Sequence, residues 1–293
     1  MANKKVKDNL WGYFFIAPQM IGFLVFSLIP TLAALVLSFF EWDIVSTPKF
    51  TKLNNFKFIF QSGSDFFLAL KNTVIYIIYT VPIGLFLALI FAVLLNNVAG
   101  KMIYRAIFFM PTITNSVAIS LVWMWLFNGD FGVINTVLKS IGINGPQWLT
   151  DPNIVMLSIS IMSIWWGLGY NITIFLAGLQ SIPHVYYEAA TIDGANAIQK
   201  FFNVTVPLIS PTTFFVMIMS LINGFQVFDQ IFIMTNGGPA KASYSLVFYI
   251  YQSGFKDFQM GIATSVSMMM FLIIMIITIL QFKFSNKWVF YDR

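Results

Sequence analysis

The chain contains no cysteine, a single histidine and few charged residues, and each scarcity excludes a class of protein. Without cysteine there is no disulfide framework, thiolate metal site or cysteine nucleophile, and one histidine, His184, leaves little for a histidine-based metal centre. Only 9% of the residues are charged and 58% are apolar, whereas about a quarter are charged in soluble domains. This composition disfavours a soluble enzyme, a nucleic-acid-binding protein or a disordered chain.

The charged residues that are present separate six uncharged stretches. A bilayer core about 30 Å thick requires roughly 20 helical residues, and every stretch is long enough to span it. Because backbone amides must be paired in lipid and the stretches are uniformly apolar, we expect α-helices rather than a β-barrel. The sequence therefore predicts an all-α integral membrane protein with six transmembrane helices. The stretches cover residues 9–40, 72–100, 106–129, 152–187, 201–228 and 258–282.

The distribution of lysine and arginine predicts that both termini are cytoplasmic. Nine Lys and Arg residues fall in the 46 positions assigned to the inside, and seven fall in the 83 positions assigned to the outside. The apolar part of the first helix is too long for a signal peptide, so we expect it to remain as an anchor. The expected organisation is a cytoplasmic tail at 1–10, a first transmembrane helix at 11–40, an external loop at 41–71, a five-helix core at 72–282 and a cytoplasmic tail at 283–293.

The spans contain no acidic or basic side chain well inside them, and the sequence contains no phosphate-binding loop. Proton relays need intramembrane ionisable groups, so this pattern argues against proton coupling. Asp229, at the outer edge of the fifth span, is the nearest candidate for a proton or sodium site, although ordinary solvation also explains an interfacial carboxylate. Gly100-Lys101 is followed by Met102 and lacks the upstream glycine of a GxxxxGK[ST] loop. We expect the energy for any uphill transport to enter through a partner.

Neutral polar and aromatic side chains do occur within the spans. They are Asn115, Ser116 and Ser120 in the third span, Ser163, Trp165, Trp166, Tyr170 and Asn171 in the fourth, and Ser220, Asn223 and Gln226 in the fifth. Amides and hydroxyls can match the hydrogen bonds of an uncharged hydroxylated ligand, and aromatic faces can cover its C–H surface. The same groups also serve as interhelical hydrogen bonds and as an interfacial aromatic belt, and the residues alone leave both roles open.

The predicted inside loop, residues 181–200, is rich in small residues. Pro183 fits the first turn of a helix, so we expect a short helix that ends before Gly194. Gly194 can adopt the positive φ that reverses the chain before the next span. A helix lying on lipid headgroups would carry Lys and Arg, whereas Glu188 and Asp193 would be repelled by anionic lipid. The pattern indicates a docking surface for another protein.

In this loop the sequence resembles the signature of the membrane permease subunits of binding-protein-dependent ABC importers. The signature is Glu-Ala-Ala, three residues, Gly, nine residues and Ile-x-Leu-Pro. Here it reads Glu188-Ala189-Ala190, Gly194 and Val204-Thr205-Val206-Pro207 at the same spacing. The Asp193-Gly194-Ala195 form is similar to the carbohydrate branch, which includes the maltose, multiple-sugar and glycerol-phosphate permeases. Other segments agree in order over nearly the whole chain, among them Thr235-Asn236-Gly237-Gly238-Pro239.

The resemblance implies a type I ABC importer permease fold with a cytoplasmic coupling helix that sits in a cleft of a separate ATPase. The residues implied in ATPase coupling are Glu188, Ala189, Ala190, Asp193, Gly194, Ala195 and Pro207. The implied substrate pathway lies between the fourth and fifth spans, at Gly169, Tyr170, Asn171, Asn223, Gly224 and Gln226. Position 224 is glycine where the family has an amide, so the resemblance does not identify the sugar.

The resemblance also implies the partners that supply what this chain lacks. They are a second six-helix permease chain that forms a heterodimer, two cytoplasmic ATPase subunits, an extracytoplasmic solute-binding protein and a sugar substrate, with no nucleic acid. ATP and magnesium would bind to the partner ATPase, so neither a cofactor nor a catalytic residue is expected in this chain. The implied function is the translocation path of an ATP-driven carbohydrate importer, in which ATPase closure moves the helices through the coupling loop.

Two alternatives remain open from the residues alone. A secondary sugar carrier without an ATPase could be built from twelve helices in a dimer. An intramembrane hydrolase would need a nucleophile and an activating base within the bilayer, but the spans contain no carboxylate and the only histidine lies in the loop. Accumulation of sugar that depends on an ATPase, and not on an ion gradient, would eliminate the carrier.

Overall fold

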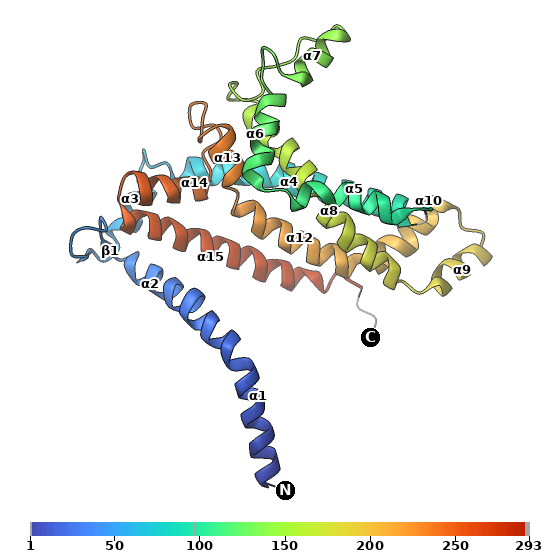
Figure 1. The fold of residues 1–293 in the computed structure, drawn as a ribbon, viewed down its shortest axis with the longest axis horizontal. Helices are drawn as coiled ribbons and strands as arrows, with labels where there is room; N and C mark the ends of the chain where they lie inside the picture. The colour runs from blue at the N-terminus through green and yellow to red at the C-terminus, as the bar shows by residue number, and fades with distance from the viewer. Residues whose placement is uncertain (1, 97, 291–293) are drawn as a thin grey trace. The chain divides into compact units, whose positions relative to one another are not determined.

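The computed structural model describes residues 2–96 and 98–290, and the chain divides into two compact units. One unit comprises the residues up to Ser64 together with Ile250–Met269, and the other comprises Asp65–Tyr249 together with the residues from Met270 onward. Among the described residues the only strands form one two-stranded hairpin, and the other regular elements are helices (Figure 1). The helical fold expected from the composition is confirmed.

Four helices are long and apolar enough to cross a membrane, and two bent helix pairs raise the number to six if each pair is one span. The unbroken spans are Trp11–Leu37, Phe66–Asn96, Val155–Ser181 and Met260–Ser285. The third and fifth spans are bent, by 95° between Met102–Ile113 and Ser116–Leu126 and by 65° between Ala197–Leu208 and Ser210–Phe225. The six predicted segments are present, and the sharp bends are an addition that the sequence analysis did not anticipate.

The first unit begins with a long apolar helix. α1 (Ala2–Phe23), the π-helical turn η1 (Leu24–Leu28) and α2 (Ile29–Leu37) follow one another without a break. No residue in its apolar window is buried within the chain, and Phe15 and Phe26 are 74% and 82% exposed. A helix that is apolar on all sides and leaves these sides uncovered by its own chain is typical of a span that faces lipid or another membrane subunit.

A short hairpin follows, and one carboxylate closes its turn. β1 (Phe40–Glu41) pairs antiparallel with β2 (Lys49–Phe50). The Asp43 carboxylate accepts hydrogen bonds from the hydroxyl and the backbone N–H of Ser46, both at 2.7 Å, and from the N–H of Val45 at 3.1 Å. The hydrogen bonds from Ser46 stabilise the ionised form and hold the pKa of Asp43 below its ordinary value. Local polar contacts therefore order this turn.

Buried polar groups join the hairpin to its neighbours in the first unit. In α3 (Asn54–Phe60), the Asn55 amide donates to the carbonyl oxygens of Ser38 and Phe40, both at 2.9 Å. The π-helical turn η3 (Gln252–Lys256) precedes α15 (Met260–Ser285), where the Ser265 hydroxyl also donates to the Ser38 carbonyl at 2.9 Å. Ser38 directly follows α2, and the last carbonyls of a helix have no partner within it, so two of these bonds satisfy a carbonyl at the helix end.

The second unit is built around four packed helices, α4 (Phe66–Asn96), α5 (Lys101–Ile113), α8 (Val155–Ser181) and α12 (Ser210–Phe225). Their shared core contains Ala88 and Ala92 of α4, Phe175 and Leu176 of α8, and Val216 of α12. The small alanine side chains allow α8 to approach α4 closely, and the larger side chains fill the remaining space. This packing holds in place the residues that face the cavity described below.

A polar side chain forms a local hydrogen bond at the break in each bent span. Between α5 and α6 (Ser116–Leu126), Thr114 is extended and the Asn115 side chain accepts from the N–H of Val117 at 2.9 Å. In the other span, α10 (Ala197–Lys200), the π-helical turn η2 (Phe201–Thr205) and α11 (Val206–Leu208) precede α12. At that break the Ser210 hydroxyl donates to the Pro207 carbonyl at 2.6 Å.

The shorter helices of the second unit lie at the two ends of the bundle. α6, α7 (Val133–Ser140) and α13 (Asp229–Met234) lie at one end, and α9 (His184–Ile192) and α10 lie at the other (Figure 1). At the α13 end, the Asn72 amide donates to the carbonyls of Lys241 and Tyr244 at 2.9 and 3.1 Å. The Thr73 hydroxyl accepts from the N–H of Leu246, the first residue of α14 (Leu246–Tyr251), at 3.0 Å. These bonds attach the segment after α13 to α4.

Candidate functional site

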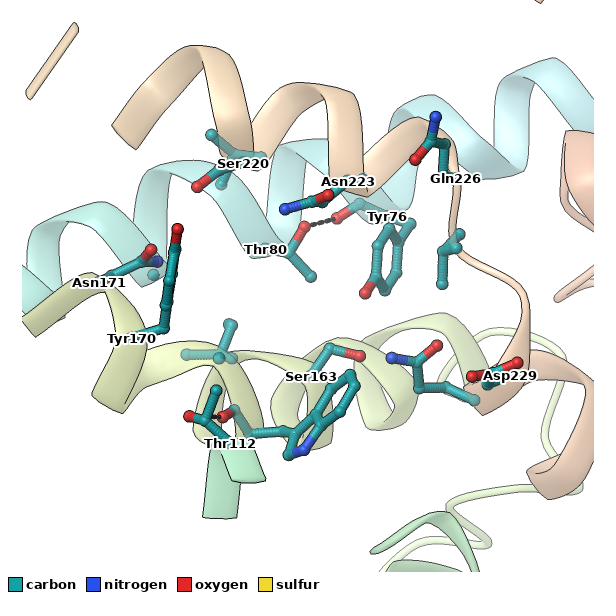
Figure 2. A pocket seen from close by; sticks show the side chains of 18 of the residues that line it. Tyr76, Thr80, Thr112, Ser163, Tyr170, Asn171, Ser220, Asn223, Gln226 and Asp229 are labelled. Atoms are coloured by element: carbon teal, nitrogen blue, oxygen red, sulfur yellow. Dashed lines mark hydrogen bonds between the residues drawn. The ribbon is translucent and has the colours of Figure 1, made fainter. Parts of the chain in front are cut away.

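A cavity of about 520 Å³ lies among α4, α8 and the end of α12 in the second unit (Figure 2). Small-molecule sites typically enclose roughly 300–1,000 Å³, so a sugar can be accommodated. Of the six residues implied in the substrate pathway, Gly169 is not among those that line the cavity. That these residues contact substrate stays a prediction. The other five all line the cavity: Tyr170, Asn171, Asn223, Gly224 and Gln226.

Four side-chain amides line the cavity, those of Asn171, Asn223, Gln226 and Gln230. Within the described part of the chain none of these four side chains has a hydrogen-bond partner; those of Asn223 and Gln226 are exposed, and that of Gln230 is buried. A side-chain amide offers two N–H donors and a carbonyl acceptor. Each of these groups can therefore bind two hydroxyls of a ligand at once, one as donor and one as acceptor.

Three hydroxyl groups of the cavity are already used as donors. Thr80, Thr112 and Ser163 each donate to a backbone carbonyl at 2.8 to 2.9 Å, so towards a ligand they can act only as acceptors. The rings of Tyr76 and Trp166 add apolar surface beside them. Tyr76 and Thr80 of the second span were not among the predicted residues. Their four-residue spacing places them on one face of the helix, and this is the signal that could have indicated them.

Other polar and aromatic residues of the spans serve the fold instead. Asn115 caps α6, and the Ser120 hydroxyl donates to the Ser116 carbonyl at 2.7 Å. Trp165 lies outside the cavity lining, with its ring centre 5.4 Å from that of Trp123. The hydrogen bonds of Asn115 and Ser120 therefore lie within α6, and only the Trp123–Trp165 contact joins two helices, α6 and α8.

Gly169 packs two helices together. It is buried in α8, and a Cβ at this position would collide with the carbonyl of Phe108 in α5. The α5 and α8 backbones can approach this closely only because the residue has no side chain. Gly224 does line the cavity, but a Cβ there would lie 2.8 Å from the Ile77 side chain of α4. Helix packing therefore gives a direct physical reason for glycine at both positions.

Asp229 is the only acidic or basic residue among those that line the cavity. It is the first residue of α13, its side chain is exposed, and its carboxylate accepts a hydrogen bond from the Ser116 hydroxyl of α6. Figure 2 places it at the end of the cavity opposite Tyr170 and Asn171. Among the described residues no three His, Cys, Asp or Glu side chains are grouped so that they could hold a metal ion. The structure thus shows a single carboxylate in an otherwise neutral polar site.

α9 carries the signature residues at the other end of the bundle. The predicted short helix is confirmed, and Glu188, Asp193 and Gly194 are exposed. Gly194 has φ +75°, as predicted, and no atom lies within 4 Å of the position of an added Cβ. The N–H of Ala195 donates to the Ala190 carbonyl at 2.9 Å, so the helix ends in a Schellman motif. The result is an open surface of small side chains beside a sharp turn.

The loop that contains α9 is bonded to the span that follows it. The Tyr187 hydroxyl lies 3.0 Å from the Thr205 hydroxyl of η2, and the Lys200 ammonium donates to the Thr191 hydroxyl at 2.7 Å. Pro207, the last of the residues implied in coupling, lies in α11 rather than on α9. These contacts link α9 to η2 and, through α11, to α12, which carries the cavity amides.

Comparison with known proteins finds relatives along almost the whole chain. Residues 72–289 match the family described as "Binding-protein-dependent transport system inner membrane component". The probable ABC transporter permease protein YesP of Bacillus subtilis (strain 168) is 41% identical, over 98% of this chain and 94% of YesP. The arabinooligosaccharides transport system permease protein AraP of Halalkalibacterium halodurans is 37% identical, over 92% of this chain and 85% of AraP.

The fold is also found among solved structures. A crystal structure of a bacterial alginate ABC transporter, in complex with an alginate pentasaccharide-bound periplasmic protein, contains a similar chain. It superposes with a TM-score of 0.84 and covers 97% of this chain and 96% of that chain. The two sequences are 23% identical, so this likeness shows a shared fold.

Proposed function

Because the chain belongs to the family of inner membrane components of binding-protein-dependent transport systems, we propose that it forms one half of the substrate path of an ATP-driven carbohydrate importer. The chain is a multi-pass membrane protein, and it is a transport subunit of the ABC permease type. Its relatives include a permease for arabinooligosaccharides, which supports a sugar as the substrate.

The cavity is the observation that carries the proposed substrate class. Its four unpartnered amides can bind hydroxyl groups in pairs, and the rings of Tyr76, Trp166 and Tyr170 can cover the C–H faces of a sugar. An apolar ligand would leave the amides unpaired, and each buried unpaired polar group costs about 1–3 kcal/mol. A polyhydroxylated ligand satisfies them. Tyr170, Asn171, Asn223, Gly224 and Gln226 are therefore the proposed substrate contacts in this subunit.

The exposed turn of α9 is the proposed docking site of the ATPase. Glu188, Ala189, Ala190 and Asp193, together with Gly194 and Ala195, would insert into a cleft of the ATPase. Ala and Gly side chains let the two backbones approach closely, and the Tyr187–Thr205 contact would carry the movement of α9 into η2 and α12. A rigid-body displacement at one end of the bundle would then rearrange the cavity near the other end.

The remaining partners follow from the same arrangement. A second six-helix permease chain, forming a heterodimer, would enclose the path from the opposite side, and two ATPase subunits would supply ATP and magnesium sites. An extracytoplasmic solute-binding protein would deliver the sugar at the α13 end. The lysine and arginine distribution supports placing α9 and both termini in the cytoplasm.

Uptake measurements in intact cells test the proposal against a secondary carrier. Cells that express the complete transporter are given radiolabelled sugar under two conditions. In one, a protonophore is added while the ATP concentration is held constant, and in the other the companion ATPase is deleted. The proposal predicts that accumulation persists with the protonophore and disappears in the deletion strain. Accumulation that collapses with the protonophore and persists without the ATPase would reject ATP-driven import.

A further inference from the structure

Asp229 introduces a negative charge into a cavity that otherwise presents neutral groups. It is the only acidic or basic residue that lines the cavity, and none of the described lysine, arginine or histidine side chains forms an ion pair with it. The other polar residues in the lining are amides, hydroxyls and phenols, together with the Trp166 indole. No cation in the lining offsets the carboxylate, so its field acts on whatever enters.

The carboxylate is held in place by α6. The Ser116 hydroxyl donates to one of its oxygens, and the other oxygen remains available as an acceptor. Figure 2 shows Asp229 at one end of the cavity, beyond Ser163 and opposite Tyr170 and Asn171. An acceptor-only group at this place can bind a donor hydroxyl of a sugar, but it repels a second carboxylate or a phosphate.

We propose that Asp229 acts as a charge filter, so that this subunit passes uncharged saccharides and disfavours uronates and sugar phosphates. This inference rests on the proposed function for its substrate class. The physical reason is Coulombic, because two negative charges a few ångströms apart in a partly dehydrated cavity repel strongly, whereas a neutral sugar gains a hydrogen bond to a charged acceptor. Hydrogen bonds to charged groups are among the stronger ones in proteins.

The absence of cysteine from the sequence provides a test of the charge that does not require the sugar to be known. A single cysteine replaces the exposed Asn223 or Gln226, and the complete transporter is studied in membrane vesicles. Its reaction rates with a cationic and an anionic methanethiosulfonate of equal size are measured. The ratio of the two rates reports the electrostatic potential at the cysteine.

We expect the rate ratio in the single-cysteine protein to favour the cationic reagent. Adding Asp229→Asn should lower this ratio by about 5-fold or more, because it removes one charge several ångströms from the cysteine. Asp229→Glu should retain the high ratio, which separates loss of charge from loss of structure. Asp130→Asn is the matched control, since Asp130 is an exposed acid that does not line the cavity. That control should leave the ratio unchanged.

Two results would overturn the charge filter. One is an equal ratio in the wild-type and Asp229→Asn backgrounds. The other is failure of both cysteines to react with either reagent, because the cavity would then be closed to charged solutes whatever residue stands at position 229. Neither reaction depends on ATP or on sugar uptake, so these results are independent of whether the chain serves an ATP-driven importer.

Competition for uptake then tests the consequence for specificity. The competitors are two matched pairs that differ at C6, glucose with glucuronate and galactose with galacturonate. Each compound is added in excess to vesicles that take up the labelled substrate. In wild type the neutral sugar of each pair should inhibit uptake at a lower concentration than the uronate. Asp229→Asn should reduce the ratio of these two inhibitory concentrations by about 5-fold. An unchanged difference, or better competition by the uronates in wild type, would contradict the proposal.

Discussion

The Tyr187 hydroxyl on α9 lies 3.0 Å from the Thr205 hydroxyl at the start of the fifth span. Thr205 is buried, and Tyr187 packs against the apolar core formed by α4, α8 and α12. α9, the proposed docking helix, is therefore bonded directly to the span that carries Asn223 and Gln226. In the proposed mechanism this contact transmits the movement of α9 to the cavity.

Tyr187→Phe should loosen coupling without preventing assembly. The substitution removes one hydrogen bond worth about 1 kcal/mol and keeps the ring, so the ratio of ATP hydrolysed to sugar transported should rise by roughly 5-fold or less. The measurement is parallel ATPase and uptake assays on the reconstituted transporter. Tyr186→Phe is the control, because the adjacent Tyr186 is exposed and no hydrogen bond links it to the fifth span. Equal ratios in wild type and Tyr187→Phe would count against transmission through this contact.

Gly194→Asp should release the ATPase. The position has φ +75°, which strains a residue with a side chain, and the carboxylate would enter the proposed docking surface. An unpaired charge buried at an interface costs about 2 kcal/mol or more, so copurification of the ATPase should fall by roughly 10-fold or more. Membrane insertion should be unaffected.

The control for Gly194→Asp is Gly142→Asp. Gly142 also has a positive φ, +81°, and open space around its Cβ position, but it lies beside α7 at the other end of the bundle. It should reproduce the backbone strain and retain the ATPase. Full sugar-stimulated ATP hydrolysis by Gly194→Asp would refute the proposed docking role of this turn.

Gln226→Leu should weaken transport of a neutral sugar and leave the assembled complex intact. It removes a side-chain amide from the cavity lining, and the loss of one or two hydrogen bonds should raise the KM for uptake by about 5- to 10-fold. Gln180→Leu is a suitable control, since Gln180 is exposed near the end of α8 and does not line the cavity. Wild-type uptake by Gln226→Leu would remove this residue from the site.

Gly169→Ala should destabilise the chain although it adds a single methyl group. The new Cβ would meet the Phe108 carbonyl, and overpacking of this kind costs about 1–3 kcal/mol. Thermal unfolding of the purified complex in detergent should occur at a lower temperature than in wild type. Gly167→Ala, two residues away with no atom within 4 Å of its Cβ, should unfold at the wild-type temperature. Identical unfolding of the two variants would show that α5 and α8 can separate without penalty.

The features that local chemistry determines were predictable from the sequence. Gly194 follows the short helix expected after Pro183, and a glycine there indicates a helix end with positive φ. The six spans follow from the spacing of charged residues, because the length needed to cross a bilayer is fixed. Asn223 and Gln226 could be selected as amides near the end of an apolar span, and both line the cavity.

Features that depend on how the helices pack were not predictable from one sequence. Tyr76 and Thr80 line the cavity because of how α4 is rotated about its own axis where it packs against α8. The apolar residues of α4 lie on all sides of the helix, so the sequence does not reveal that rotation. The 95° bend before α6 needs a cap at Asn115, but an asparagine in an apolar span is equally compatible with an unbroken helix. The sequence did not reveal that α5 packs closely against Gly169, whose expected place on the pathway stays a prediction.

Reconstitution tests the central claim most directly. The chain is placed in proteoliposomes with its second permease and solute-binding protein, ATP is enclosed on the ATPase side, and accumulation of labelled sugar is measured with and without the ATPase subunits. The account predicts accumulation against a gradient only when the ATPase is present. Accumulation by the permease chains without any ATPase would contradict it.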